Sequence, residues 1–291
     1  MKKKISFSTK GQRADIDNLT IYRLLANRYA DAVGPFVFLD HIALTVHTAK
    51  AETKKSGTGQ HPHRGIATLT YILNGEGEHY DSRGNHAKVY SGGIQWMKAG
   101  NGIIHDENLI PDSQKKDGLT HAFQFWINLP SINKKEQPQY LAIQADEVPQ
   151  KNLPDNKGWI KVIMGEYENL VSKIPNYSKQ ILYHIHIEAG EQFSIETEIG
   201  LEYAAVLPEQ NAIINESEIH AGEFIEFDRD GGTIEIKSNS ETPVDIIVFG
   251  GEAYTEPTFA EGPFVMNSDK EIGEAYRDFY AGKYGEINYH Q

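Results

Sequence analysis

The sequence predicts an all-β protein that folds into two stacked β-barrels of the jelly-roll type and ends in a short helix. Short apolar runs bounded by Gly, Asn, Asp or Pro recur along its 291 residues, and few stretches show helical periodicity. The runs follow one another at intervals of roughly 10 to 20 residues, which is typical of sandwiches and jelly rolls. The chain is also long enough to form two packed domains.

The first half of the chain contains the strongest strand signals. Residues 68–73 and 122–129 are rich in β-branched and aromatic side chains, and Asn74-Gly75 ends the former with a hairpin signal. Shorter strands are expected next to glycine turns, at 34–40, 77–81, 94–97 and 103–107. A loop is expected at 51–59, where the residues are polar and small.

A polar break at 133–137 precedes a second β region. Its expected strands are 159–163, 181–187, 202–207, 223–227, 233–236 and 244–249. We therefore place an N-terminal domain at 1–130 and a C-terminal domain at 131–291.

The end of the chain has a helical pattern. Apolar or aromatic residues occupy positions 272, 275, 276 and 279, which lie on one face of a helix over 269–280. Ser268 followed by Glu271 is the pattern of a capping box at the helix start.

Composition excludes several classes of function. The chain has no cysteine, so any metal must be held by imidazole and carboxylate groups, and a reducing, cytoplasmic location is expected. The formal net charge of -13 disfavours direct contact with nucleic acid. No apolar run approaches the roughly 20 residues of a membrane span, and no signal peptide is evident.

Two pairs of residues suggest a metal site. His61 and His63 are two residues apart, as are His105 and Glu107, so in extended segments each pair lies on one face of its strand. Two such pairs on facing strands can converge on one ion, and three imidazoles with one carboxylate suit a divalent first-row metal. Asp106 is expected to point away from that metal by the same alternation.

Other histidines are interpreted differently. His184 and His186 have the same spacing as the first pair, but no acid–histidine pair follows them at a strand end, so we interpret them as ordinary sheet residues. His79 lies on the strand nearest the predicted site and is a candidate for its lining.

Several blocks of sequence resemble the pirin family of the cupin superfamily. They span nearly the whole chain, and their order makes chance similarity improbable. The blocks are His61-Pro62-His63-Arg64-Gly65, Gln95-Trp96-Met97, Ala99-Gly100 with Gly102-Ile103 and His105, Gln124 to Pro130, Pro138-Gln139-Tyr140, Gly262 to Asn267 and Ala275-Tyr276-Arg277-Asp278.

This resemblance implies a bicupin with one mononuclear metal site in the N-terminal barrel. The ligands carried over are His61, His63, His105 and Glu107, with iron(II) favoured and nickel, copper, manganese or zinc acceptable. It also implies a metal-free second barrel and a tail, at about 258–291, that packs back on the N-terminal domain.

The sequence departs from the general cupin pattern at Ala67 and Thr68, where many metal cupins have a glutamate. Glu107 is then the one carboxylate ligand and the candidate catalytic base. Further candidates for the pocket or for orienting the ligands, beside His79, are Gln124, Asp40, Met97, Trp96 and Phe125. The last three fit equally well as ordinary core residues.

Two functions follow from the resemblance. The first is a metal-dependent quercetin 2,3-dioxygenase, in which Glu107 accepts the proton of a flavonol hydroxyl and O₂ is the second substrate. The second is a metal- or redox-responsive regulator that binds transcription regulators or metabolic enzymes. A monomer is expected, because two barrels bury their own interface.

Overall fold

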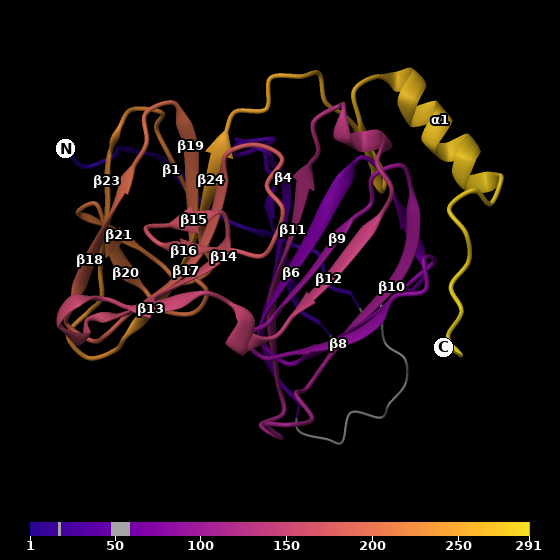
Figure 1. Ribbon diagram of the computed structural model, residues 1–291. Helices are drawn as coiled ribbons and strands as arrows, with labels where there is room; N and C mark the ends of the chain where they lie inside the picture. Colours follow the sequence, from indigo (N-terminus) through magenta and orange to yellow (C-terminus); the bar gives the residue numbers. More distant parts are fainter. Residues whose placement is uncertain (17–18, 48–58, 291) are drawn as a thin grey trace. The chain divides into compact units, whose positions relative to one another are not determined.

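The computed structural model describes residues 1–16, 19–47 and 59–290 (Figure 1). The expected loop at 51–59 lies, apart from Gly59, outside the described residues. Contacts divide the chain into two compact units. The N-terminal unit comprises Ala14–Ile21, Val37–Glu147 and Thr255–Gln291, and the C-terminal unit comprises Met1–Arg13, Tyr22–Phe36 and Val148–Tyr254.

These units interleave along the chain and do not meet at a single boundary near residue 130. The first strand, β1 (Ile5–Lys10), pairs with β22 (Glu223–Phe227) and so lies in the C-terminal unit. β12 (Gln139–Ile143) pairs with β9 (Ile94–Lys98) in the N-terminal unit. Strand pairing joins segments distant in sequence, so the position of a strand along the chain does not by itself give its unit.

The N-terminal unit is a barrel of two antiparallel sheets. One sheet has the order β5-β10-β7-β8, and in the other β12, β9, β6, β11 and β4 are consecutive neighbours. The remaining elements are β4 (Phe36–Val46), β5 (His61–His63), β6 (Ile66–Asn74), β7 (Glu76–Asp81), β8 (His86–Tyr90), β10 (Ile103–Ile110), β11 (Leu119–Asn128), η1 (Asn133–Lys135) and η2 (Ala145–Glu147).

Apolar side chains from both sheets pack inside this unit. One cluster joins Ile42, Ile72, Val89, Leu109 and Ala122, which come from five different strands. Burial of this kind stabilises each strand on its neighbours by about 1.5–3 kcal/mol per large aliphatic side chain.

The C-terminal unit repeats the architecture. Its larger sheet has the order β1-β22-β19-β24-β17-β14-β13, and its smaller sheet has the order β18-β23-β20-β21. Ile160, Ile185 and Ile246 from the larger sheet meet Ile214 and Ile234 from the smaller one in a single core. The strands β3 (Ile21–Leu25) and β2 (Gln12–Arg13) are not part of these two sheets and follow β4 in the sheet that contains β12, β9, β6 and β11. The other bounds are β13 (Gln150–Asn152), η3 (Pro154–Asn156), β14 (Gly158–Met164), β15 (Glu166–Tyr167), β16 (Leu170–Val171), β17 (Gln180–Ile187), β18 (Gln192–Thr197), β19 (Leu201–Val206), β20 (Ala212–Ile214), β21 (Ser217–Ile219), β23 (Gly232–Lys237) and β24 (Val244–Glu252).

The C-terminal segment belongs to the N-terminal unit. It contains the hairpin β25–β26 (Phe259–Glu261 and Phe264–Met266) and the helix α1 (Asp269–Tyr280), drawn in yellow in Figure 1. Ser268 caps the helix by accepting a hydrogen bond from the backbone N–H of Glu271, as the sequence predicts. Arg64 Nη1 donates to Asp278 Oδ2 at 2.8 Å and ties the helix to the strand region near His63.

The all-β class with one C-terminal helix is thus confirmed. Among the described residues, no helix is long and apolar enough to cross a membrane.

Candidate metal centre

Strand register brings the predicted residues together. β10 pairs with β5 on one side and β7 on the other, which sets His105 opposite His61 and Glu107 opposite His79. His61 and His63 lie on one face of β5, and His105 and Glu107 share a face of β10, because side chains two apart on a strand point the same way.

Three histidines form a compact group. The ring centroids of His61 and His105 are 4.3 Å apart, and each lies 5.0 Å from the centroid of His63. The Nε2 atoms of His61 and His105 are 2.9 Å apart. One nitrogen from each ring lies within 4.8 Å of the others, an arrangement that could hold a metal ion.

Backbone carbonyls orient two of these rings. His61 Nδ1 lies 2.8 Å from the carbonyl oxygen of Gly59, and His63 Nδ1 lies 3.0 Å from that of Pro263. A proton on each Nδ1 leaves Nε2 as a lone-pair donor, the usual arrangement in histidine metal sites. The Pro263 contact comes from the C-terminal segment, and sequence reasoning did not find it, because a carbonyl leaves no residue-type signal.

Glu107 belongs to a second group, together with His79 and His105. Its Oε1 lies 3.5 Å from His105 Nδ1 and 3.6 Å from His79 Nδ1. Gln124 Nε2 donates to its Oε2 at 2.9 Å. The four predicted ligands are therefore neighbours, but the structure distributes them over two groups that share His105.

His79 is held firmly beside Glu107. Its Nε2 lies 3.2 Å from Asp81 Oδ2, and its ring stacks on Tyr140 with centroids 4.0 Å apart. Asp81 also accepts hydrogen bonds from the side chain and backbone of Asn85. Sequence reasoning proposed His79 but missed Asp81 and Tyr140. The i, i+2 spacing of His79 and Asp81 is a signal in the sequence that could have identified Asp81.

Burial and neighbouring charges set the ionisation of the group. Burial lowers the pKa of His63 well below its usual value, with His105 and His61 adding to the effect, and burial lowers the pKa of His105 to about 4. Burial would raise the pKa of Glu107, but His105 and His79 outweigh it and hold that pKa well below its usual range. A neutral His63 and a neutral His105 beside an ionised Glu107 are in the forms that bind metal ions.

The other predicted residues divide by strand face. Met97 pairs with Thr68 on one neighbouring strand and with Tyr140 on the other. Thr68 in turn pairs with Trp126, and the ring centroid of Trp126 lies 4.9 Å from that of His63. Met97 therefore lies on the face of its sheet that looks toward the histidines.

Trp96 and Phe125, which are candidates either for the pocket lining or for the core, lie on the opposite face. Trp96 and Phe125 both pair with Leu69, so the three side chains share one face of the sheet. Gln124 precedes Phe125 by one residue and therefore points to the other face, and both Trp96 and Phe125 are fully buried. Alternation thus makes them core residues. Asp40 is buried on β4, two residues from Phe38, and is a member of neither group.

The second His-x-His pair has a different environment. His184 Nε2 and His186 Nδ1 lie 2.8 and 2.9 Å from the same oxygen, Asp245 Oδ1. Trp159 stacks on His186 with ring centroids 5.3 Å apart. The carboxylate thus contacts both rings, and the groups of described residues that could hold a metal ion lie in the N-terminal unit.

The residues of the N-terminal unit fit a divalent transition metal. The donor set is imidazole nitrogen with a nearby carboxylate, which accepts iron, nickel, copper, manganese or zinc. Two jelly-roll units, one of them with a histidine cluster between its sheets, define a protein of the two-domain cupin class.

Comparison with known proteins specifies the family. Residues 18–127 match the family model for pirin, and residues 182–285 match that for the pirin C-terminal cupin domain. A Pseudomonas aeruginosa protein provisionally named quercetin 2,3-dioxygenase is 31% identical over 258 residues, 89% of each chain. The chain therefore belongs to the pirin family.

Solved structures agree with this assignment. A quercetin 2,3-dioxygenase from Acinetobacter baumannii is 29% identical and superposes with a TM-score of 0.88, over 99% of this chain and 100% of that one. A bacterial pirin from Escherichia coli, solved in complex with nickel(II), shares the fold at 18% identity and a TM-score of 0.64, over 85% of this chain and 99% of its own.

Proposed function

We propose that this protein is a metal-dependent dioxygenase that cleaves quercetin-type flavonols with O₂. The observation that carries the proposal is the convergence of His61, His63 and His105 beside an ionised Glu107. The names of the Pseudomonas and Acinetobacter relatives support the choice of flavonol as substrate.

In this proposal, His61, His63 and His105 hold the ion, and Glu107 is the fourth ligand or lies beside it. A bound divalent metal would supply Lewis acidity that lowers the pKa of a coordinated hydroxyl group. Iron(II) is our first choice, and the nickel-bound relative makes nickel the second.

In this proposal, Glu107 accepts the proton of the flavonol 3-hydroxyl. Its depressed pKa keeps it ionised at neutral pH, but also makes it a weak base by itself. Gln124 holds Oε2 by a 2.9 Å hydrogen bond, while Oε1 faces His79 and His105. His79 and Gln124 thus fix the direction of the carboxylate, and Asp81 fixes the direction of His79.

The test is aerobic turnover of quercetin by protein reloaded with iron, nickel or copper. Loss of flavonol absorbance and release of carbon monoxide are measured beside metal content. We expect activity that requires metal, that falls by at least 100-fold in Glu107→Ala (about 2.7 kcal/mol) and that disappears in His105→Ala.

His184→Ala is the matched control, because it removes a histidine of the same spacing in the other unit and should leave turnover unchanged. If the protein binds each of the three metals stoichiometrically but turns over quercetin with none of them, flavonol cleavage is contradicted. In that case, the metal-responsive regulatory role, with a protein partner, would become the leading hypothesis.

A further inference from the structure

The C-terminal segment packs against the outer face of the strand that carries two of the candidate ligands. Side chains alternate along β10, and because His105 points toward the other clustered histidines, Ile104 and Asp106 point the other way. Ile104 packs against the apolar core of the C-terminal segment, and Tyr289 of that segment donates to Asp106 Oδ2 at 2.5 Å. The buried members of that core are Phe264, Met266, Ile272, Ala275 and Tyr284.

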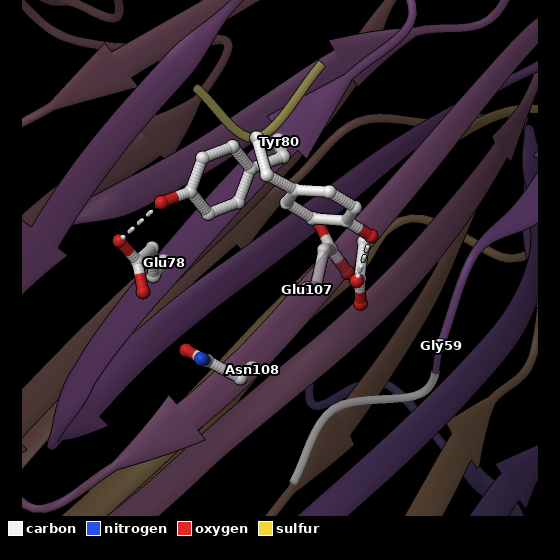
Figure 2. A pocket seen from close by; sticks show the side chains of 7 residues that line it. Gly59, Glu78, Tyr80, Glu107 and Asn108 are labelled. Carbon is white, nitrogen blue, oxygen red and sulfur yellow. Dashed lines mark hydrogen bonds between the residues drawn. The ribbon is translucent and has the colours of Figure 1, made fainter. Parts of the chain in front are cut away.

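A small cavity of about 90 Å³ lies on the same outer face, where the end of the segment meets the sheet. Tyr289 lines it together with Glu78 and Tyr80 of β7 and Asn108 of β10. Figure 2 shows Glu78 and Tyr80 on one side of this cavity, joined by a hydrogen bond of 3.1 Å. The clustered histidines are not among the described residues that line it. The segment therefore contacts the back of the ligand-bearing strand rather than the cluster at this point.

On β5, by contrast, the segment contacts a candidate ligand directly. The Nδ1 atom of His63 lies 3.0 Å from the carbonyl oxygen of Pro263. The next residue, Arg64, accepts at its carbonyl oxygen a hydrogen bond of 3.2 Å from the backbone N–H of Val265. The guanidinium group of Arg64 donates to Asp278 at 2.8 Å. The chain around His63 is therefore fixed both to the hairpin and to the helix of the segment.

Two glycines of the ligand-bearing chain permit this close contact. A Cβ atom at Gly65, which follows β5, would lie 2.0 Å from the carbonyl oxygen of Val265. A Cβ atom at Gly102, which precedes β10, would lie 2.1 Å from the ring of Tyr284. Both distances are far below the separation of about 3.5–4.0 Å at which non-bonded carbon atoms attract one another. The segment thus packs without a gap against the turns that begin or end the ligand-bearing strands.

The contact between His63 and Pro263 depends on the electronic state of the imidazole ring. When Nε2 binds a metal ion, the ring loses electron density and its Nδ1–H group becomes a stronger donor. Hydrogen bonds that involve a charged group stabilise a fold more than neutral ones. The docked segment is therefore stabilised by the ion, and by linkage the docked segment increases the affinity for the ion by the same factor.

We propose that metal binding and docking of the C-terminal segment are coupled through the contact between His63 and Pro263. The hairpin and α1 are then held more firmly on the N-terminal unit when the centre holds an ion. This coupling rests on the metal binding of the proposed function, but it does not depend on the flavonol. It also gives a metal-responsive regulator an output, because the ion controls how often the surface under α1 is exposed.

The test is hydrogen–deuterium exchange of the full chain, metal-free and saturated with nickel(II), followed by mass spectrometry. Exchange in peptides that cover residues 264–280 measures transient release of the segment. We expect nickel to slow this exchange about fivefold, the effect of one neutral hydrogen bond that becomes charge-assisted. The β20–β21 hairpin of the C-terminal unit is the internal reference and should not change. Equal slowing in both regions would reflect general stabilisation and would overturn the coupling.

His61→Ala and His63→Ala are the matched variants, because each removes one imidazole of the cluster. His63 contacts Pro263 of the segment, whereas His61 contacts Gly59. At nickel concentrations that saturate each variant, His61→Ala should keep the slower exchange of the segment and His63→Ala should lose it. Equal slowing in the two variants would overturn the coupling through Pro263.

These measurements separate the coupling from the proposed function. Stoichiometric nickel binding to the wild type without slower exchange of the segment would overturn the coupling and leave the metal centre intact. Slower exchange with nickel, but no turnover of quercetin, would support the coupling and remove flavonol cleavage.

Discussion

The two units of this protein each contain a His-x-His pair on a strand, and the pairs have different surroundings. His61 and His63 lie next to β10, which presents His105 and Glu107 to them. His184 and His186 lie next to β24, which presents Asp245, and its one carboxylate oxygen contacts both rings. Identical spacing thus produces a candidate metal centre in one unit and a closed hydrogen-bonded cluster in the other.

The neighbouring strand, rather than the spacing, makes this difference. Each His-x-His pair fixes only which face of its strand the rings occupy. A third imidazole on the adjacent strand brings two Nε2 atoms within 2.9 Å of each other, and an arrangement of this kind could hold a metal ion. A carboxylate on the adjacent strand satisfies the rings without a metal.

The largest expected effect comes from removing the third imidazole. His105→Ala should lower nickel affinity by at least 100-fold, because it deletes the residue shared by both metal-binding groups. Metal content after equilibrium dialysis, measured by mass spectrometry, checks this. His186→Ala should bind as much nickel as the wild type. Loss of nickel from this variant would show that the second His-x-His pair also contributes to metal binding.

The next effect concerns the stability of the C-terminal unit. Asp245→Ala leaves two imidazole nitrogens without their acceptor, so we expect the free energy of unfolding to fall by about 1–3 kcal/mol. Urea unfolding followed by far-UV circular dichroism measures it. Metal affinity should not change, and a shift in nickel binding would show that the two clusters are not independent.

A smaller effect is expected where Glu107 is oriented. Gln124→Met keeps the side-chain length but removes the 2.9 Å hydrogen bond to Glu107 Oε2, and we expect nickel affinity to fall by about tenfold. Isothermal titration calorimetry is the measurement. Retention of wild-type affinity would mean that His79 and His105 alone orient the carboxylate.

The smallest effect is a pH dependence of the C-terminal unit. Burial lowers the pKa of His184, although Asp245 opposes this, so the unfolded chain binds a proton first as the pH falls below about 6.5. Stability should therefore be full above that pH and decline toward pH 5. Urea midpoints of metal-free protein at pH 7.5 and 5.5 should differ less in His184→Gln than in the wild type. If the urea midpoint changes equally between the two pH values in both proteins, His184 is not a source of the pH dependence.

Much of the local structure was predictable from sequence. The expected strands at 68–73 and 181–187 lie within β6 (Ile66–Asn74) and β17 (Gln180–Ile187), and the expected helix coincides with α1. The positions of Met97, Trp96 and Phe125 show the limit. Each is buried as expected, but only Met97 lies on the face toward the histidines, because the strand register assigns the faces.

The sequence by itself determined the all-β class, the capped helix and the pairing of residues by strand face, because these depend on neighbours within a few positions. Tertiary structure decided the rest: that Glu107 faces His79, that the Pro263 carbonyl orients His63, and that Tyr289 donates a hydrogen bond to Asp106. Those contacts join segments up to 200 residues apart. Alternation along a strand contains no information about which distant segment packs beside it.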